Sequence, residues 1–281
     1  MRHCGQRRPA RLFVPRRPCV GDPHLSARRG PLTRILRQVH PLPTALRRAL
    51  SHLSPPARRG SSVTGRCVVF DLDGVLVMSE HLWEQGWASV SAQHGYTWTP
   101  EDTRRCQGKS VPEWARYVSE RTGMDEQAAA DSVIAVVAAA YDRNEVPLID
   151  GALELVQAAA MRVPVALASS APRAIIDRVM ATTPVGEYFR ATVSSAEVAA
   201  GKPAPDVYQE AVARLGARSA GSYAVEDSSN GIRAAAAAGL TVLGMEHPQY
   251  PVDRDASGRA AGVYHSLEDV TAVLVSFLDE R

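Results

Sequence analysis

Two acidic pairs follow short apolar runs of the sequence. Asp71 and Asp73 stand after one run, and Glu226 and Asp227 stand after another. Alternation along an extended chain places Asp71 and Asp73 on the same side, and Gly74 lets the backbone turn sharply after them. Paired carboxylates can act as a nucleophile or as a general acid and base, but an acid after a strand is also a common helix cap. One pair alone therefore does not define a site.

Two further clusters carry groups that suit an anion. Ser169 and Ser170 end an apolar run, and Pro172 after them is typical of a first helical turn, whose free N–H groups can bind an anion. Lys202, one of only two lysines among the 32 basic residues, stands between a glycine and a proline. A Lys-Pro pair is often no more than a surface turn. Four polar clusters in one chain are hard to produce by chance, and together they predict one site.

The elements that must position these residues are predicted from the hydrophobic pattern. Continuous apolar runs predict buried strands, and amphipathic or alanine-rich runs predict helices. The predicted strands cover residues 67–71, 163–169, 191–194, 223–226 and 240–245, and the predicted helices between and after them cover 172–180, 206–215, 230–238 and 267–278. This alternation predicts an α/β fold, a Rossmann-like doubly wound parallel sheet with helices on both faces. Ligands bind such sheets outside the carboxyl ends of the strands, where the four clusters are expected.

A segment without strands interrupts this alternation. Residues 80–149 are predicted to be helical only, with helices near Trp83 and over residues 111–121 and 127–141. We expect this segment to form a small α-helical cap domain inserted into an α/β core of residues 66–79 and 150–281. A basic Pro/Arg-rich leader, residues 1–65, is expected to precede both.

The formal charge of the chain changes sign near the boundary between the leader and the core. Residues 1–66 hold fifteen arginines, nine prolines and one acid, Asp22, which gives a formal charge of +14, whereas the rest holds 17 basic and 29 acidic residues, which gives −12. The leader cannot bury enough apolar surface to offset chain entropy, so we expect it to be disordered. Its composition is typical of an organelle transit peptide and could also suit nucleic acid or anionic lipid. A nonfunctional tail, or an upstream start codon chosen in error, explains it as well.

The remaining composition narrows the classes of partner and compartment. The acidic body argues against nucleic acid as a partner, and no apolar run approaches the roughly 20 residues of a membrane-spanning helix. The four cysteines show no spacing of a metal site or disulfide framework. A cytoplasmic location is therefore expected, although the leader leaves organelle targeting open.

In this order, the motifs resemble those of the haloacid dehalogenase superfamily of Mg²⁺-dependent phosphotransferases. Its first motif, an apolar run followed by Asp-x-Asp-Gly, is matched by Phe70-Asp71-Leu72-Asp73-Gly74-Val75. Ser169 matches the second motif, Lys202 the third, and Glu226 with Asp227 the acidic pair of the fourth. The resemblance covers about residues 66–280. It is nearest to the helical-cap branch, which includes sugar-phosphate phosphatases and beta-phosphoglucomutase.

The resemblance implies roles for the acids. Asp71 would be the nucleophile that forms an aspartyl-phosphate, and Asp73 the general acid and base. Carboxylates that converge with a phosphate dianion repel one another, and a hard cation such as Mg²⁺ relieves that repulsion. The implied Mg²⁺ ligands are the Asp71 carboxylate, the Asp73 backbone carbonyl and Asp227, with Glu226 bound directly or through water.

The resemblance also implies groups that bind the substrate. Lys202 would neutralise charge on the phosphoryl group, while Ser169, Ser170 and nearby N–H groups would donate hydrogen bonds. In the cap, the loop of residues 107–110 is expected to reach the active site. Its Lys109 is a candidate for binding a substrate hydroxyl or a second anion, with a solvated loop charge as the alternative.

The expected function is Mg²⁺-dependent hydrolysis of a small phosphorylated metabolite, a sugar or polyol phosphate, by a monomer. Asp73 favours phosphoryl transfer, because dehalogenases and phosphonatases of the superfamily lack this second acid. A beta-phosphoglucomutase-type phosphotransferase is the alternative within enzymes. It is weakened by Trp83 and Val111, which stand where the mutase has a histidine and an arginine. A non-catalytic binding protein is the alternative from another class.

Overall fold

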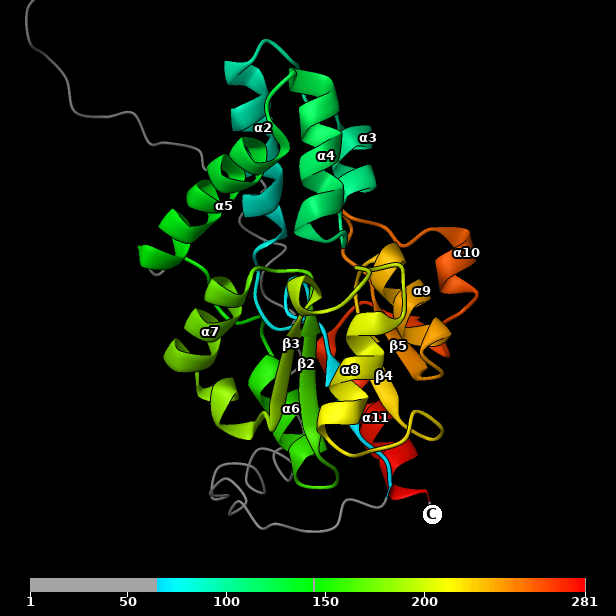
Figure 1. Ribbon diagram of the computed structural model, residues 1–281. Helices are drawn as coiled ribbons and strands as arrows, with labels where there is room; N and C mark the ends of the chain where they lie inside the picture. The colour runs from blue at the N-terminus through cyan, green and yellow to red at the C-terminus, as the bar shows by residue number, and fades with distance from the viewer. Residues whose placement is uncertain (1–64, 144, 281) are drawn as a thin grey trace, which may run out of the picture. The chain divides into compact units, whose positions relative to one another are not determined.

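A computed structural model describes residues 65–143 and 145–280 of the chain (Figure 1). These residues belong to one compact unit, and a second unit, Met1–Pro41, lies outside the described residues. The prediction of a disordered leader therefore also falls outside them, apart from Gly65. No helix within the described residues is long and apolar enough to cross a membrane.

A parallel sheet forms the centre of the described unit. Its strands, in chain order, are β1 (Val68–Phe70), β2 (Val165–Ser169), β3 (Ala191–Ser194), β4 (Tyr223–Glu226), β5 (Thr241–Met245) and β6 (Gly262–Tyr264). They lie side by side in the order β3-β2-β1-β4-β5-β6, and every pair is parallel. The central strand β1 pairs Val69 with Ala166 of β2 and with Ala224 of β4. This order is that of a Rossmann-like sheet, and the predicted fold class is confirmed.

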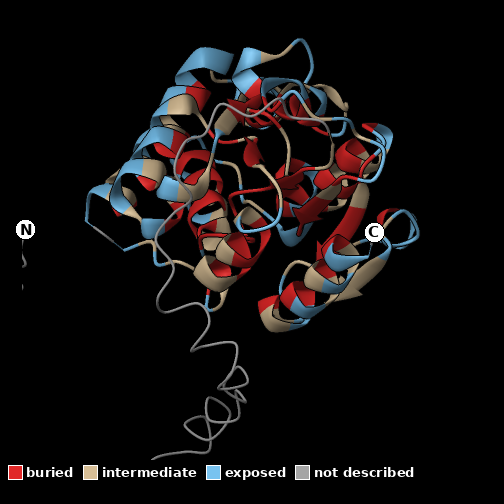
Figure 2. Cartoon of the chain, turned by 90° about the horizontal axis from the view of Figure 1, so that it is seen from below, coloured by how far each residue is buried: buried red, intermediate tan, exposed pale blue. Residues whose placement is uncertain are grey.

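Helices cover both faces of the sheet because both faces of its strands are apolar. Along β1, Val68 and Phe70 belong to one buried cluster, and Val69 belongs to the other. The first cluster includes residues of α6 (Ala152–Ala160), α7 (Arg173–Thr182) and α11 (Leu267–Asp279), and the second includes residues of α8 (Asp206–Arg214), α9 (Ser229–Ala237) and α10 (Arg254–Ser257). Figure 2 shows the buried residues gathered between these layers.

Between β1 and α6, the regular elements formed by the described residues are all helices, as predicted. They are α2 (Glu80–Gln93), α3 (Pro100–Cys106), α4 (Val111–Thr122) and α5 (Glu126–Asp142). Their shared core contains the indole rings of Trp83, Trp87 and Trp114, whose centroids lie 6.1 to 6.3 Å apart. The chain enters and leaves this segment along two adjacent stretches, where Val77 pairs with Leu148. That the segment is a domain of its own stays a prediction.

Four of the α-helices and strands were not predicted individually, and α3 is one of them, within the segment that was expected to be helical. Helix α6 is amphipathic, and it packs against the sheet in a stretch for which no element was expected. Strand β6 has only three half-buried residues at the sheet edge, and α10 has only four residues. Such short elements depend on neighbours that are distant in sequence, so the local pattern gives them little signal.

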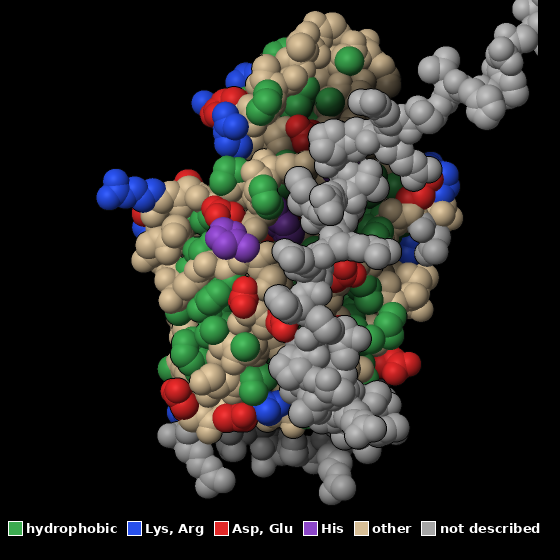
Figure 3. Space-filling view, turned by 180° about the vertical axis from the view of Figure 1, so that it is seen from behind, with side chains coloured by type: hydrophobic (Ala, Val, Ile, Leu, Met, Phe, Trp, Pro, Cys, Tyr) green, Lys and Arg blue, Asp and Glu red, His purple; other side chains and the backbone are tan. Residues whose placement is uncertain are grey.

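The surface of the described residues mixes both signs of charge. Acidic and basic side chains are interspersed on the face shown in Figure 3. Many of them form exposed pairs such as Arg104 with Glu101 and Arg143 with Glu145. Exposed pairs of this kind contribute about 0–1 kcal/mol each, so the fold depends on its buried groups.

Arg66 connects the start of β1 to the end of α11. Its guanidinium donates hydrogen bonds to the carbonyl oxygens of Phe277 at 3.3 Å, Leu278 at 2.9 Å and Glu280 at 3.1 Å. The last carbonyls of a helix have no partner within the helix, and a cation there also complements the helix dipole. Arg66, counted with the basic leader by charge, thus belongs to the core by its contacts.

We expect Arg66→Ala to lower the free energy of unfolding by about 1–3 kcal/mol, because three carbonyls lose a charged donor. Urea denaturation measures this loss, and hydrogen exchange would show reduced protection in the last turn of α11. Arg116→Ala is the control, because Arg116 is exposed and its ion pair with Glu126 is long, at 3.4 Å. Equal effects of the two substitutions would contradict the role of Arg66.

Candidate active site

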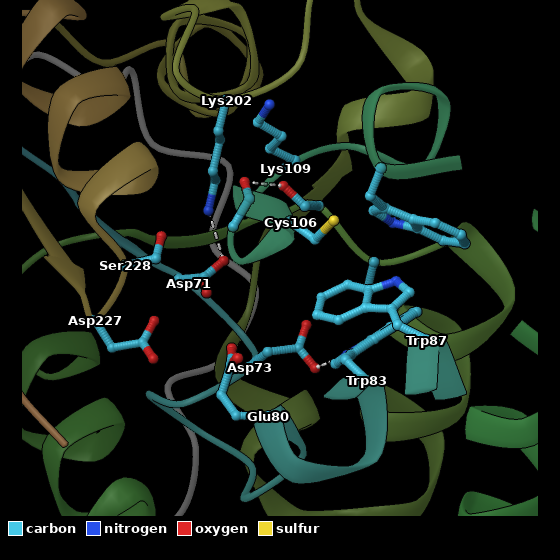
Figure 4. Close-up of a pocket in the computed structure, with 14 residues that line it drawn as sticks. Asp71, Asp73, Glu80, Trp83, Trp87, Cys106, Lys109, Lys202, Asp227 and Ser228 are labelled. Carbon is cyan, nitrogen blue, oxygen red and sulfur yellow. Dashed lines mark hydrogen bonds and ion pairs between the residues drawn. The ribbon is translucent and has the colours of Figure 1, made fainter. Parts of the chain in front are cut away.

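A small cavity lies between the carboxyl ends of the strands and the helices α2 and α4 (Figure 4). Asp71 and Asp73 enter it after β1, and Asp227 enters it after β4. These strands are neighbours at the point where the strand order reverses, which is where ligands bind in such sheets. The cavity volume is about 30 Å³, enough for roughly one or two water molecules. This volume is smaller than a phosphate ester, so groups that line the cavity must move for a substrate to enter.

Lys202 lies between two of the predicted acids. Its Nζ is 2.7 Å from Asp71 Oδ1 and 2.6 Å from Glu226 Oε1, and its side chain is 1% exposed. Burial raises the pKa of Asp71 to about 8, although the charge of Lys202 lowers it. Burial alone would lower the pKa of Lys202, but the carboxylates of Asp71 and Glu226 raise it above its usual value. The ammonium group is therefore charged and fixed beside Asp71.

Glu226 is fully occupied by donors from the protein. Its Oε1 accepts hydrogen bonds from Lys202 and from the hydroxyl of Tyr208 at 3.0 Å, and its Oε2 accepts from the backbone N–H and the hydroxyl of Ser228. A carboxylate has about four acceptor sites, so all of them are used. Gly231 is required beside it, because a Cβ there would lie 1.6 Å from Glu226 Oε1.

Asp227 has the opposite environment. It is 2% exposed, and neither of its carboxylate oxygens has a hydrogen-bond partner among the described residues. Burial raises its pKa well above the usual value, and the charges of Glu80 and Glu226 raise it further. Gly74, with φ of +73°, allows this approach, because a Cβ there would lie 1.9 Å from Asp227 Oδ2.

Asp73 is held by two donors from the start of α2. Its Oδ1 accepts hydrogen bonds from the hydroxyl of Ser79 and from Trp83 Nε1, the latter at 2.9 Å. Burial raises the pKa of Asp73, and these two hydrogen bonds lower it. The predictions did not include Trp83 among the site residues. Its helical spacing predicted a side chain packed in the core of the helical segment. The ring is packed there, but the spacing did not indicate that its N–H group donates to Asp73.

The predicted anion-binding residues are placed unequally. Lys109 and Ser170 line the cavity, whereas Ser169 does not, and its hydroxyl accepts a hydrogen bond from the N–H of Ala171 at 3.0 Å. The Ser170 hydroxyl donates to the carbonyl of Gly108 at 2.9 Å, which joins the loop before α4 to the core. The loop of residues 107–110 therefore reaches the site as predicted.

Lys202 does not stand directly at a strand end, which corrects the prediction. It follows β3 by a 3-10 turn, Ser195–Glu197, and a loop, and its long side chain extends to the site from there. Six of the predicted site residues line one cavity, whereas Ser169 and Glu226 do not. The six are Asp71, Asp73, Lys109, Ser170, Lys202 and Asp227.

Comparison with known proteins agrees with this geometry. A model of the haloacid dehalogenase-like hydrolase family matches residues 66–239, more than half of the chain. The chain belongs to this family. The predicted family is thus confirmed, and so is the predicted enzyme class, a phosphoric monoester hydrolase of this family.

Individual relatives differ in their names. The chain is 31% identical over 184 residues to the validoxylamine A 7'-phosphate phosphatase of Streptomyces hygroscopicus subsp. limoneus, over 64% of this chain and 85% of that protein. It is 28% identical over 186 residues to hexitol phosphatase B of Escherichia coli K12, over 64% of this chain and 83% of that protein. Its fold is similar to that of a beta-phosphoglucomutase from Clostridium difficile, with a TM-score of 0.66 at 17% identity, over 77% of this chain and 98% of that chain.

The acids of this haloacid dehalogenase-like hydrolase fit a hard divalent cation. Oxygens of Asp71, Glu226 and Asp227 lie within 4.8 Å of one another. The unpartnered carboxylate of Asp227 is the clearest sign, because a buried charge normally has a partner or a metal ion. Oxygen ligands of this kind suit Mg²⁺. Glu226 would have to lose a hydrogen bond to bind the ion directly.

We expect Asp227→Asn to separate metal binding from folding. Without divalent metal, the variant should be more stable than the wild type by on the order of 1 kcal/mol, because an unpartnered buried charge is removed. Millimolar Mg²⁺ should raise the melting temperature of the wild type and leave that of the variant unchanged.

Thermal unfolding in EDTA and in Mg²⁺ measures both effects. Asp150→Asn is the control, because Asp150 is exposed and should keep the wild-type response to Mg²⁺. A variant that is destabilised in EDTA, or that Mg²⁺ still stabilises as much as the wild type, would contradict the assignment.

The buried acids also predict a pH dependence of the metal-free protein. Asp71 has a pKa of about 8 in the folded state against 3.8 as its ordinary value, so between these values the folded state retains a proton that the unfolded state has released. Stability therefore falls as the pH rises, by on the order of 1 kcal/mol per pH unit. Acids with lowered pKa values, such as Glu197, already contribute fully above about pH 5.

Urea denaturation in EDTA should accordingly give a lower free energy of unfolding at pH 8 than at pH 5.5. Saturating Mg²⁺ should reduce the difference, because a bound cation favours the ionised acids. Equal or greater metal-free stability at pH 8 would refute this account of the buried charges.

Proposed function

We propose that the chain is a Mg²⁺-dependent phosphatase that hydrolyses a small sugar or polyol phosphate through an aspartyl-phosphate on Asp71. One observation carries this proposal. The Asp71 carboxylate lies in a small cavity between a fixed cation, Lys202, and the carboxylate of Asp227, which has no hydrogen-bond partner among the described residues. The cavity thereby brings together a candidate nucleophile, Asp71, a cation that can bind a phosphoryl group, Lys202, and a candidate metal ligand, Asp227.

The metal ion would be held mainly by Asp71 and Asp227, with the backbone carbonyl of Asp73 as a further oxygen ligand. When bound, it supplies positive charge that permits these acids and a phosphate dianion to approach one another. Lys202 supplies a second positive charge beside Asp71. The hydrogen bonds to Glu226 suggest that this acid fixes Lys202 and does not bind the ion directly.

Two steps complete the hydrolysis. In the first, a carboxylate oxygen of Asp71 attacks phosphorus, the bond from phosphorus to the alkoxide oxygen breaks, and Asp73 gives its proton to that oxygen. In the second, water attacks phosphorus and gives a proton to Asp73, and the bond to Asp71 breaks to release inorganic phosphate. Lys202 stabilises negative charge on the phosphoryl oxygens in both steps.

The nature of the substrate is supported by the helical side of the cavity. Trp83, Trp87, Trp114 and Lys109 are among the residues that line it. Aromatic faces suit the carbon skeleton of a sugar or polyol, and Lys109 suits a hydroxyl or an anion. The names of two relatives, a hexitol phosphatase and a validoxylamine A 7'-phosphate phosphatase, support the same class.

Release of inorganic phosphate from a panel of sugar and polyol phosphates tests this proposal. We expect turnover with Mg²⁺, no turnover in EDTA, and loss of at least about 10³-fold in Asp71→Asn, because the amide is not a nucleophile. Circular dichroism of the variant checks its fold. Activity retained in folded Asp71→Asn would disprove the aspartyl-phosphate route.

Product analysis distinguishes the alternatives. Incubation with beta-glucose 1-phosphate and its bisphosphate activator should give free phosphate. Formation of glucose 6-phosphate would instead identify a mutase, to which the fold is also similar. Binding of phosphate esters with no turnover of any panel member would identify a binding protein.

A further inference from the structure

The two donors to Asp73 reach the same oxygen. The Ser79 hydroxyl and Trp83 Nε1 both donate to Oδ1, and none of the hydrogen bonds among the described residues reaches Oδ2. Figure 4 shows Trp83 directed at the Asp73 carboxylate from α2. The two oxygens of this acid are therefore not equivalent.

This asymmetry determines where a proton resides. A proton on Oδ1 would have to displace a donor, whereas a proton on Oδ2 leaves both hydrogen bonds in place. The indole N–H can only donate, and it does not titrate in the working range of an enzyme. The two hydrogen bonds to Oδ1 therefore leave Oδ2 as the oxygen that is free to exchange a proton.

We propose that Trp83 is a positioning residue for the general acid and base. Its N–H group holds Oδ1 of Asp73, so that Oδ2 gives the proton to the departing alkoxide and later takes a proton from the attacking water. This inference rests on the proposed function, because it assigns a task to Asp73 in that reaction.

The surroundings of Trp83 make its N–H a fixed donor. The side chain is buried, with 6% exposure, and its ring packs against the rings of Trp87 and Trp114 at 6.3 and 6.2 Å. Ser79 precedes it by four residues, which places both donors on one face of the start of α2. A rigid aromatic cluster thus sets the position of the acid, in addition to the end of β1.

The same arrangement links the acid to closure of the site. Asp73 follows β1, whereas Trp83 lies in α2, one of the elements that line the cavity of about 30 Å³. The hydrogen bond from Trp83 forms when α2 lies over the strand ends. Asp73 is therefore oriented for proton transfer when the substrate is enclosed.

The neighbouring tryptophan provides a matched control. Trp87 belongs to the same aromatic cluster and is buried, but its Nε1 has no hydrogen-bond partner among the described residues. Trp83→Phe and Trp87→Phe each remove one indole N–H from one cluster. Only the first removes a donor to Asp73.

The test compares substrates whose leaving groups differ in their need for a proton. An alkyl phosphate, such as a hexitol phosphate, needs acid catalysis, whereas p-nitrophenyl phosphate releases a stable anion and needs little. We expect Trp83→Phe to lower kcat on the alkyl phosphate by about 10- to 100-fold, and kcat on p-nitrophenyl phosphate by less than about threefold. Trp87→Phe keeps all donors to Asp73, so the ratio of its two kcat values should stay within about threefold of the wild-type ratio, even if the ring change alters both values.

Two further variants complete the design. Asp73→Asn should also lower kcat more on the alkyl phosphate than on p-nitrophenyl phosphate. Its loss on the alkyl phosphate should be larger, about 10²- to 10⁴-fold. Ser79→Ala removes the other donor to Oδ1, and its side chain makes no helix-capping hydrogen bond, so it serves as a second test should Trp83→Phe fail to fold. It should also lose activity selectively on the alkyl phosphate.

The outcomes separate this inference from the proposed function. Equal loss on both substrates in Trp83→Phe, or the same behaviour as Trp87→Phe, would overturn the positioning role while the phosphatase stands. A wild-type protein that releases phosphate from neither substrate would overturn the phosphatase and the positioning role together.

Discussion

A buried ammonium group between two carboxylates holds the active site together. Lys202 comes from the loop before α8, Asp71 from the end of β1, and Glu226 from the end of β4, so their ion pairs join three separate segments. The Tyr208 ring lies 5.1 Å from Lys202 Nζ, and its hydroxyl donates to Glu226. Because removing one partner of a buried ion pair costs about 3–5 kcal/mol, these groups stabilise the site only as a set.

The charges of the site do not balance within the protein. Asp71, Asp227 and Glu226 meet one buried lysine, and the pKa values of Asp71 and Asp227 are raised by burial. Protons can satisfy these acids, but a protonated Asp71 would not be a nucleophile. A divalent cation satisfies them and keeps Asp71 ionised. A bound divalent cation would therefore both stabilise the folded protein and keep the nucleophile ionised. Asp227 contributes to both effects, because its carboxylate has no hydrogen-bond partner among the described residues.

The sequence predicted the parts of the site that depend on local order. Acids directly after apolar runs were placed at strand ends, and Asp71, Asp73 and Asp227 lie there in one cavity. The spacing of Trp83 indicated a packed helix face, which is correct for its ring. Its hydrogen bond to Asp73 depends on how α2 lies against the strand ends, and residue spacing does not give that orientation.

Contacts between distant segments limited the remaining predictions. Glu226 was expected to bind the metal directly or through water, and this stays a prediction, although its oxygens do lie near those of Asp71 and Asp227. What the sequence did not indicate is that Lys202, Tyr208 and Ser228, up to 24 residues away, take its four acceptor sites. Lys202 was expected at a strand end and reaches the site from a loop instead. In both cases the residue type indicated which chemistry the side chain can do. Its hydrogen-bond and ion-pair partners come from distant segments, so they depend on how the chain packs.

Two sets of residues divide the work of the cavity. In the proposed reaction, the core supplies Asp71, Lys202 and Asp227, which would act on the phosphoryl group. Residues of α2, α4 and the loop of residues 107–110 line the other side of the cavity, where the leaving group would depart. The loop is joined to the core through Ser170, which donates to the Gly108 carbonyl, and through Asn230, which donates to the Gln107 carbonyl at 2.9 Å. Substitutions in the helical segment should therefore alter which ester is accepted without changing how phosphorus is attacked. The exception is Trp83, because it belongs to the helical segment and yet holds the acid that both steps require.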